Sequence, residues 1–320
     1  MEGTKEGFLL VMKSILEDFK VAFSTGNILN QLIVINVVVF LFFGVIGVFM
    51  TLAGESQLYS DITRYLMLPA APEKVILQPW TLITYFFFHK GFFHILWNML
   101  FMYWFGRLIT DYLGQNKLLS LYVWGGIGGG LLYLLIYNLL PFYAPMVENS
   151  YLLGASGGVI AIVVGAATFQ PNYTVPLIFL GPVKMKYIAA FYVVVSFLQS
   201  TGPNAGGEIA HLGGAFMGYL VISQLQKGND WSKPVVNFII WVKSLFKPQP
   251  NIKVSYRSER KTKAKATTSS RKTTKASAAS SVGNNTSQED IDAILDKISE
   301  KGYDALSKAE KQKLFDASKD

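Results

Sequence analysis

The most constraining feature of this sequence is a set of long stretches that contain no charged side chain. Residues 21–54, 118–147 and 149–183 include no Asp, Glu, Lys or Arg. Such stretches hold the roughly 20 apolar residues that a helix needs to cross the hydrocarbon core of a bilayer. Charged residues make up 16% of the chain, whereas soluble proteins carry about 25%. The sequence therefore predicts a polytopic membrane protein.

The apolar runs predict six membrane-spanning helices, because a helix satisfies its backbone hydrogen bonds within one segment. The alternation of apolar and polar residues that a transmembrane barrel requires is missing from the sequence. The predicted fold class is all-α, with a six-helix membrane bundle followed by a small cytoplasmic helical hairpin at the C-terminus. We place the spans at residues 31–53, 86–106, 118–140, 154–170, 186–200 and 210–226.

The charges of the connecting loops predict which side of the membrane each loop faces, because Lys and Arg gather on the inner side. With the N-terminus inside, the inner connections carry Arg107, Lys117, Lys184 and Lys186, and two outer connections carry Glu148 and Glu208. We therefore expect both termini inside. A compact six-helix form with inside tails favours the cytoplasmic (inner) membrane of a bacterium.

The segments outside the spans differ in composition and are predicted to be separate parts. Residues 247–287 contain ten Lys or Arg and one Glu. A basic run beside a membrane segment is expected to bind anionic lipid, and we favour this partner over nucleic acid. The predicted parts are an interfacial or cytoplasmic segment at 1–30, the membrane domain at 31–226, an interfacial segment at 227–246, a basic disordered linker at 247–287 and a helical hairpin at 288–320.

Residues 288–320 carry the signals of two short helices. Residues 287–290 resemble a capping box, and an apolar series follows at helical spacing. The series consists of Ile291, Ile294, Leu295 and Ile298. Gly302 is expected to end this helix, and residues 307–317 are expected to form the second. Two amphipathic stretches, at residues 8–23 and 234–246, are expected to lie along the membrane interface.

The residue inventory excludes several kinds of chemistry. The chain contains no cysteine, which excludes disulfides, thiolate metal sites and a cysteine nucleophile. It contains three histidines, too few to suggest metal chemistry. We therefore expect neither a metal nor another cofactor.

Polar residues recur near the outer ends of the second, fourth and sixth spans, where a polar side chain is costly and is a candidate functional residue. They are His94 and Asn98, then Ser156, then His211. Ser156 lies at the start of a helix, where free N–H groups and the helix dipole favour an oxyanion. His211 can act as the base that a serine nucleophile needs. His94 and Asn98 share one helix face and can donate hydrogen bonds to a developing negative charge.

Each of these residues also has a structural interpretation. Small residues such as Gly157, Gly214 and Gly218 are typical of tight contacts between membrane helices, and we expect the last two to bring the sixth span against the fourth. A membrane histidine, or Asn98, can instead make a hydrogen bond between helices. No acidic residue is expected to complete a catalytic triad, because Glu208 is placed in the outer loop.

Three motifs together resemble the rhomboid family of intramembrane serine proteases. They are HILWN at residues 94–98, GASG at residues 154–157 and AHLGGAFMG at residues 210–218. They match the HxxxN, GxSG and AHxxGxxxG patterns of that family, in its order and on its second, fourth and sixth spans. The resemblance covers roughly residues 31–226 and leaves the basic tail outside.

This resemblance implies a serine endopeptidase with Ser156 as the nucleophile and His211 as the general base of a dyad. It implies an oxyanion hole made by the Ser156 backbone N–H and the side chains of His94 and Asn98, with Gly154 shaping the adjacent loop. The implied substrates are single-span or polytopic membrane proteins. They would be cut in or near transmembrane segments that Gly or other small residues weaken.

Two positions depart from the family pattern. Thr110 stands where family members often have a Glu after the second span. Ile160 stands where they often have a Tyr that stacks on the catalytic histidine. We therefore expect His211 to be held by packing alone, in a slower or differently tuned enzyme.

Two other functions remain open. A rhomboid-like protein can bind membrane clients without cutting them, but such proteins usually lose the serine or the histidine, and this chain has both. A transporter or channel would be expected to show more charges in its spans, broken helices in two matching halves, or a repeat. The sequence shows none of these features.

Overall fold

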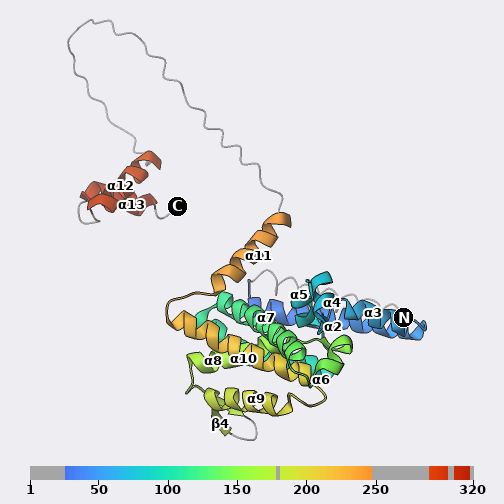
Figure 1. The fold of residues 1–320 in the computed structure, drawn as a ribbon. Coiled ribbons are helices and arrows are strands. Elements are labelled where there is room, and N and C mark those ends of the chain that lie inside the picture. Colours follow the sequence, from blue (N-terminus) through green and yellow to red (C-terminus); the bar gives the residue numbers. More distant parts are fainter. Residues whose placement is uncertain (1–25, 178–180, 247–287, 302–305, 318–320) are drawn as a thin grey trace, which may run out of the picture. The chain divides into compact units, whose positions relative to one another are not determined.

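The computed structural model describes residues 26–177, 181–246, 288–301 and 306–317, and its regular structure is mostly helical (Figure 1). The chain divides into two compact units, Met1–Asn251 and Ile252–Asp320. The predictions for residues 8–23, for the basic segment 247–287 and for a helix end at Gly302 lie outside the described residues.

Six described helices of the larger unit correspond to the six apolar runs of the sequence. They are α2 (Ile28–Leu52), α6 (Phe92–Leu113), α7 (Gln115–Leu139), α8 (Ser156–Phe169), α9 (Met185–Gln199) and α10 (Ala205–Gln226). The second run differs most from its prediction, because its helix begins at Phe92 rather than at residue 86. Gly91, before this helix, is extended, and Gly114, after it, has a φ of 86°, which glycine adopts readily.

Among the described residues, two helices are long and apolar enough to cross a membrane, and these are α2 and α7. Helices α8 and α9 are apolar but have only 14 and 15 residues. Helix α2 exposes Phe42, Val48 and Phe49 by 58%, 59% and 67%, and an exposed apolar face of this kind marks a contact with lipid or with another protein. Helix length by itself therefore supports two spans, and the prediction of six stays a prediction.

Two short strand pairs interrupt the helical pattern, and the apolar runs of the sequence do not predict them. Strand β1 (Leu68–Pro69) pairs antiparallel with β2 (Tyr151–Leu152). Strand β3 (Thr174–Leu177) pairs antiparallel with β4 (Gly181–Lys184), between α8 and α9. The first pair ties the loop before α6 to the segment just before α8, so it helps to set where α8 begins.

The loop between α2 and α6 folds into short helical turns. They are α3 (Ser56–Arg64), α4 (Pro72–Leu77), α5 (Thr81–Thr84) and a 3₁₀-helix at Tyr85–Phe87, and a second 3₁₀-helix lies at Ala144–Asn149 before β2. Side chains hold the first loop to its own backbone. Trp80 Nε1 donates to the Tyr65 carbonyl at 2.8 Å, and Thr84 Oγ1 donates to the Leu66 carbonyl at 2.7 Å.

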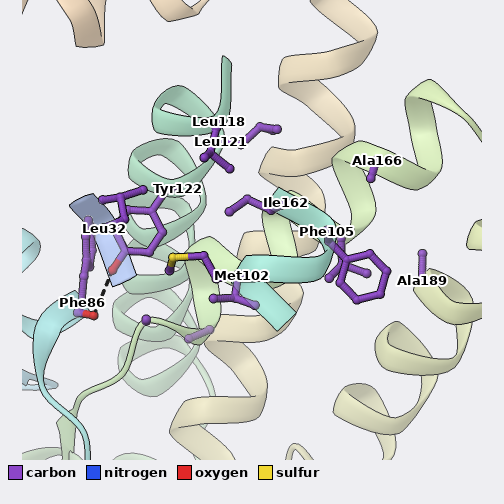
Figure 2. Packing of buried hydrophobic residues seen from close by; sticks show 14 of the residues in the cluster. Leu32, Phe86, Met102, Phe105, Leu118, Leu121, Tyr122, Ile162, Ala166 and Ala189 are labelled. Carbon is purple, nitrogen blue, oxygen red and sulfur yellow. Dashed lines mark hydrogen bonds between the residues drawn. The ribbon is translucent and has the colours of Figure 1, made fainter. Parts of the chain in front are cut away.

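The core of the larger unit contains interlocking side chains from α6, α7 and α8 (Figure 2). Met102, Leu121 and Ile162, one from each helix, are completely buried. Tyr122, also buried in α7, donates its hydroxyl to the Phe86 carbonyl at 3.2 Å, which is the dashed line in Figure 2. A buried polar atom requires such a partner, and this bond ties the segment before α6 to the core.

Helices α7, α8 and α10 pack so closely that their backbones touch. A Cβ atom added to Gly125 of α7 would lie 2.8 Å from the Gly157 carbonyl oxygen of α8. One added to Gly129 of α7 would lie 2.7 Å from the Ala210 carbonyl oxygen of α10. One added to Gly214 of α10 would collide with the Gly157 carbonyl oxygen. The glycines therefore bring the three helices together, and Figure 1 shows them side by side.

The segment after α10 is fixed to α7 before it enters α11 (Ser232–Phe246). Trp124 Nε1 donates to the Trp231 carbonyl at 3.0 Å, and the Lys117 ammonium pairs with Asp230. Burial raises the pKa of Asp230, but hydrogen bonds from Lys117 and Ser232 outweigh burial and lower this pKa to about 2. The start of α11 is therefore tied to the larger unit by polar contacts.

The smaller unit contains α12 (Gln288–Lys301) and α13 (Lys308–Ala317). The Ser307 N–H donates to Glu310 Oε2 at 2.7 Å, and the Glu310 N–H donates to Ser307 Oγ at 3.3 Å. This reciprocal pair is a capping box at the start of the second helix, in addition to the one predicted at residues 287–290. Lys297 of α12 donates to Glu310 Oε1 at 2.8 Å, so the cap of the second helix also holds the first.

Candidate active site

The four polar positions singled out in the sequence meet in one pocket of about 660 Å³. His94 and Asn98 come from α6, Ser156 from α8 and His211 from α10. The other lining residues are mainly apolar or aromatic, and they are Phe93, Trp97, Phe101, Leu153, Val159, Ile160, Tyr192, Asn204 and Gly207. The pocket therefore combines a few convergent polar groups with an apolar wall, as small-molecule and substrate sites commonly do.

Ser156 is the first residue of α8, and the preceding loop sets its position. Its backbone N–H belongs to the first turn, whose N–H groups have no partner within the helix. Gly154 has a φ of 127° and donates its N–H to the Tyr85 carbonyl at 3.0 Å. A Cβ on Gly154 would lie 2.9 Å from His94 Nε2 and 3.6 Å from Ser156 Oγ. Glycine is therefore required there by both the backbone conformation and the space.

His94 is oriented by a backbone hydrogen bond at the start of α6. The Lys90 N–H donates to His94 Nδ1 at 3.3 Å. Because Nδ1 accepts this bond, the proton of a neutral His94 ring belongs on Nε2, the nitrogen that lies beside Gly154. The ring of His89 lies edge-on to it, with centroids 5.0 Å apart. His94 can thus donate a hydrogen bond into the pocket that it lines together with Ser156.

Asn98 is buried one turn after His94 on the same helix face, with 6% exposed. Its Nδ2 donates to the His94 carbonyl at 2.8 Å. A side-chain amide has two N–H donors, so this bond leaves a second donor for the pocket that Asn98 lines. Asn98 can therefore make a structural hydrogen bond within α6 and donate another hydrogen bond to an oxyanion at the same time.

His211 is held by hydrogen-bonding groups, and the prediction of packing alone is wrong. Its Nδ1 lies 3.1 Å from Glu208 Oε2 and 3.2 Å from Ser196 Oγ. Glu208 is also not in an outer loop, because α10 begins at Ala205 and includes it in the first turn. The spacing of three residues would have placed the two side chains on one face had the helix start been known. Ser196 comes from α9, and its contact with His211 left no signal in the sequence.

The serine and the histidine share the pocket without a direct bond. Among the described residues, no hydrogen bond joins Ser156 Oγ to the His211 ring. Catalytic hydrogen bonds are often long in unliganded sites and tighten when substrate binds. Ile160, one turn after Ser156, lines the pocket and offers only an aliphatic surface to the groups around it.

Thr110 lies at the far end of α6 from this pocket. Its hydroxyl donates to the Arg107 carbonyl at 2.9 Å, within its own helix. The neighbouring Arg107 and Asp111 form an exposed ion pair at 3.8 Å. The departure at position 110 is therefore accommodated locally, away from the site.

Two protein-family models match this chain, and each matches within one of its two compact units. Residues 77–227 match the model of the Rhomboid domain, a range that contains every residue of the pocket. Residues 282–320 match a family of unknown function, DUF6576. The second range contains α12 and α13.

Comparison with curated proteins finds relatives with rhomboid-like names. The chain is 32% identical to RHOMBOID-like protein 12, mitochondrial, of Arabidopsis thaliana over 157 residues, 46% of this chain and 47% of the relative. It is 27% identical to presenilin-associated rhomboid-like protein, mitochondrial, of Rattus norvegicus over 173 residues, 52% of this chain and 43% of the relative. It is 28% identical to rhomboid-like protein 16, chloroplastic, of Arabidopsis thaliana, over 46% of this chain and 49% of the relative. The chain spans about half the length of these relatives.

Proposed function

Because residues 77–227 form a domain of the rhomboid family, we propose that this protein is an intramembrane serine endopeptidase. The observation that carries the proposal is the pocket that unites Ser156, His211, His94 and Asn98. The substrates are single-span or polytopic membrane proteins, cut in or near their transmembrane segments. The enzyme uses a Ser156–His211 dyad and no metal or other cofactor.

The reaction follows from the chemistry of these four side chains. Ser156 Oγ attacks the carbonyl carbon of the scissile peptide while its proton passes to His211. The resulting oxyanion accepts hydrogen bonds from the Ser156 N–H, from His94 Nε2–H and from the Asn98 amide. His211 then protonates the leaving amine, and an acyl group stays on Ser156. A water molecule that gives its proton to His211 hydrolyses this ester and restores the serine.

The wall of the pocket fits a peptide drawn from a membrane. Trp97, Phe101 and Tyr192 provide an apolar surface beside the polar groups, where an apolar side chain next to the scissile bond can lie. A substrate helix must unwind before it can be cut, because a helix hides its carbonyl groups in its own hydrogen bonds. We therefore expect preferred substrates to carry Gly or other small residues near the outer end of the span.

The membrane arrangement proposed with this activity has six spans and both termini on the inner side. The 14 and 15 residues of α8 and α9 are short for a span. Helix α8 is almost wholly buried, so its neighbours, and not lipid, surround it. The relatives are named as mitochondrial or chloroplastic proteins, and the bacterial cytoplasmic membrane stays a prediction from the sequence.

The test is cleavage of a single-span substrate by the purified full chain in liposomes. Wild-type protein is compared with Ser156→Ala and His211→Ala. Ser200→Ala serves as a control serine, since the Ser200 hydroxyl donates to the Phe197 carbonyl within its own turn. We expect cleavage by the wild type and by the control, and none by the other two variants. Labelling of Ser156 by a fluorophosphonate without cleavage would indicate an unsuitable substrate. Neither cleavage nor labelling would favour a client-binding protein instead.

A further inference from the structure

We propose that Glu208 is a positioning residue for the catalytic histidine, so that the site operates as a Ser156–His211–Glu208 arrangement supported by Ser196. This inference rests on the proposed function, because positioning has a meaning only if His211 acts as a base. It goes beyond the dyad expected from the sequence, in which no acidic residue took part.

The first observation behind this proposal is the short distance between Glu208 and His211. Glu208 Oε2 lies 3.1 Å from His211 Nδ1, within hydrogen-bonding distance. The two residues are one turn apart on α10, so a rigid helix sets their separation. Their side chains are only 12% and 19% exposed for Glu208 and His211. A contact so shielded from water has little competition from solvent, unlike an exposed surface pair.

The identity of the acceptor fixes the tautomer of the histidine. An ionised carboxylate can only accept hydrogen bonds, so His211 Nδ1 must carry the proton that it donates to Glu208. A neutral imidazole has one N–H, and Nε2 therefore has a free lone pair. This is the nitrogen that must accept the Ser156 proton. In the opposite tautomer Nε2 carries the proton and cannot act as a base.

The site around the carboxylate favours its ionised form. Glu208 lies in the first turn of α10, where the helix dipole and free N–H groups stabilise a negative charge. When His211 takes up the serine proton it becomes a cation, and a carboxylate at 3.1 Å stabilises that cation directly. The same residue thus sets the tautomer before the reaction and offsets the charge during it.

Ser196 is a second hydrogen-bonding partner of His211, and it comes from a different helix. It is 2% exposed on α9, and its Oγ lies 3.2 Å from the same His211 Nδ1. A hydroxyl can accept from Nδ1 and donate to the carboxylate at once. The histidine ring is therefore held between α9 and α10. Ile160 and Val159, which line the same pocket, have aliphatic side chains that cannot orient a ring by hydrogen bonding.

The competing interpretation is that Glu208 and Ser196 only join α9 to α10. Both interpretations predict that removing Glu208 lowers stability, so stability alone cannot decide. The bond fixes the tautomer of the ring under either interpretation. The two interpretations differ in the reactivity of Ser156, which falls on removal of Glu208 only if the bond prepares Nε2 as a base.

The experiment measures ring-nitrogen NMR signals of ¹⁵N-histidine-labelled full-length protein in lipid nanodiscs, together with the rate of Ser156 labelling by a fluorophosphonate. The variants are Glu208→Leu, which removes the acceptor at similar size, and Glu208→Gln, which keeps a neutral acceptor. The matched control is Glu148→Leu, which removes an acidic residue paired with Lys74 in the outer loop. Thermal unfolding of each variant establishes that it is folded.

We expect His211 in the wild type to be protonated at Nδ1 and not at Nε2. Glu208→Leu should shift the ring toward the opposite tautomer and slow labelling by about 100-fold or more. Glu208→Gln should retain much of both properties, and Glu148→Leu should match the wild type. A wild-type proton on Nε2, or a Glu208→Leu protein with unchanged tautomer and labelling, would overturn the inference. Failure of the proposed function is distinguishable, because the wild type would then neither cleave nor label, whatever its tautomer.

Discussion

Helices α8 and α10 form one helix pair, and helices α12 and α13 form another. The interactions seen between the two helices differ from one pair to the other. In the larger unit the backbones touch, and Gly214 and Gly218 face the backbone of Gly157 and Ala161 without room for a methyl group. In the smaller unit Lys297 reaches across to Glu310. The first contact depends on shape, and the second includes an ion pair. The first should therefore be sensitive to one added methyl, and the second to pH and salt.

The largest effect is expected from Gly214→Ala. The new methyl would meet the Gly157 carbonyl, and backbone cannot move aside as a side chain can. We expect a loss of about 3 kcal/mol in the free energy of unfolding, at the upper end for an overpacked core, measured by reversible unfolding in detergent. Gly44→Ala on α2 is the matched control, because nothing lies within 4 Å of its added Cβ. Equal effects at both glycines would contradict the role assigned to shape.

The effect of an added methyl group can also be tested at the candidate active site, in the loop before Ser156. Gly154→Ala would force a side chain onto a φ of 127° and within 2.9 Å of His94 Nε2. We expect about 100-fold slower fluorophosphonate labelling, the effect of disturbing one oxyanion donor. The global fold should survive, because Gly154 lies outside the three-helix contact. Gly114→Ala is the comparison, since Gly114 also has a positive φ but nothing nearby. Normal labelling by Gly154→Ala would show that the loop is more adaptable than its geometry indicates.

The charged contact of the smaller unit should respond to acid. The Lys297 ammonium, together with the Ser307 N–H and hydroxyl, lowers the pKa of Glu310 from 4.5 to about 2. Because the folded pKa lies below the unfolded one, this contact stabilises the unit fully above pH 4.5. Its contribution is lost as the pH falls toward 2. Carboxyl-carbon NMR of Glu310 in the full chain measures the pKa directly.

A matched variant sharpens the acid prediction. Lys297→Met removes the largest cause of the lowered pKa, and we expect the pKa of Glu310 to rise toward 4.5. It should stay somewhat below that value, because Ser307 remains. A pKa of Glu310 that is the same in both proteins would mean that the ion pair does not form in solution.

The smallest effect is expected from the second ion pair of the smaller unit. Lys313 and Asp290 lie 3.1 Å apart, but their side chains are 49% and 50% exposed. Exposed pairs of this kind contribute about 0–1 kcal/mol and less at high salt. Lys313→Met should therefore leave the melting of α12 and α13, followed by amide hydrogen exchange, almost unchanged. A large loss of protection would show that this exposed pair is worth more than its geometry indicates.

Local patterns predicted much of the fold and most of the site. Apolar runs located the helices, because a segment surrounded by lipid or by other helices must be apolar along its whole length. The serine, the two histidines and Asn98 were recognisable because polar side chains are rare in such runs. Their spacing on alternate helices was enough to bring them into one expected pocket. The structure places all four in its pocket wall.

Errors arose where a helix start depended on distant contacts. The second run began at residue 86 by composition, yet α6 begins at Phe92, because the residues before it bond to α7 and to the loop before Ser156. Composition places the start of the sixth run at residue 210, yet α10 begins at Ala205. That shift of one turn converted Glu208 from a loop residue into a neighbour of His211. Composition cannot locate the first residue of such a helix, because polar residues at a helix end look the same as polar residues in a loop.

By itself, the sequence determined that the chain forms apolar helices, that small residues recur where these helices must touch, and that a serine and a histidine lie among them. These properties are local, because each depends on residue type and on spacing along one segment. Only the tertiary structure decided which side chains hold His211. Ser196 reaches its Nδ1 from α9, and a contact between separate helices depends on how they pack, which no single segment records. Glu208 lies on α10 with His211, and its contact became visible only once the start of α10 was known, which composition does not locate.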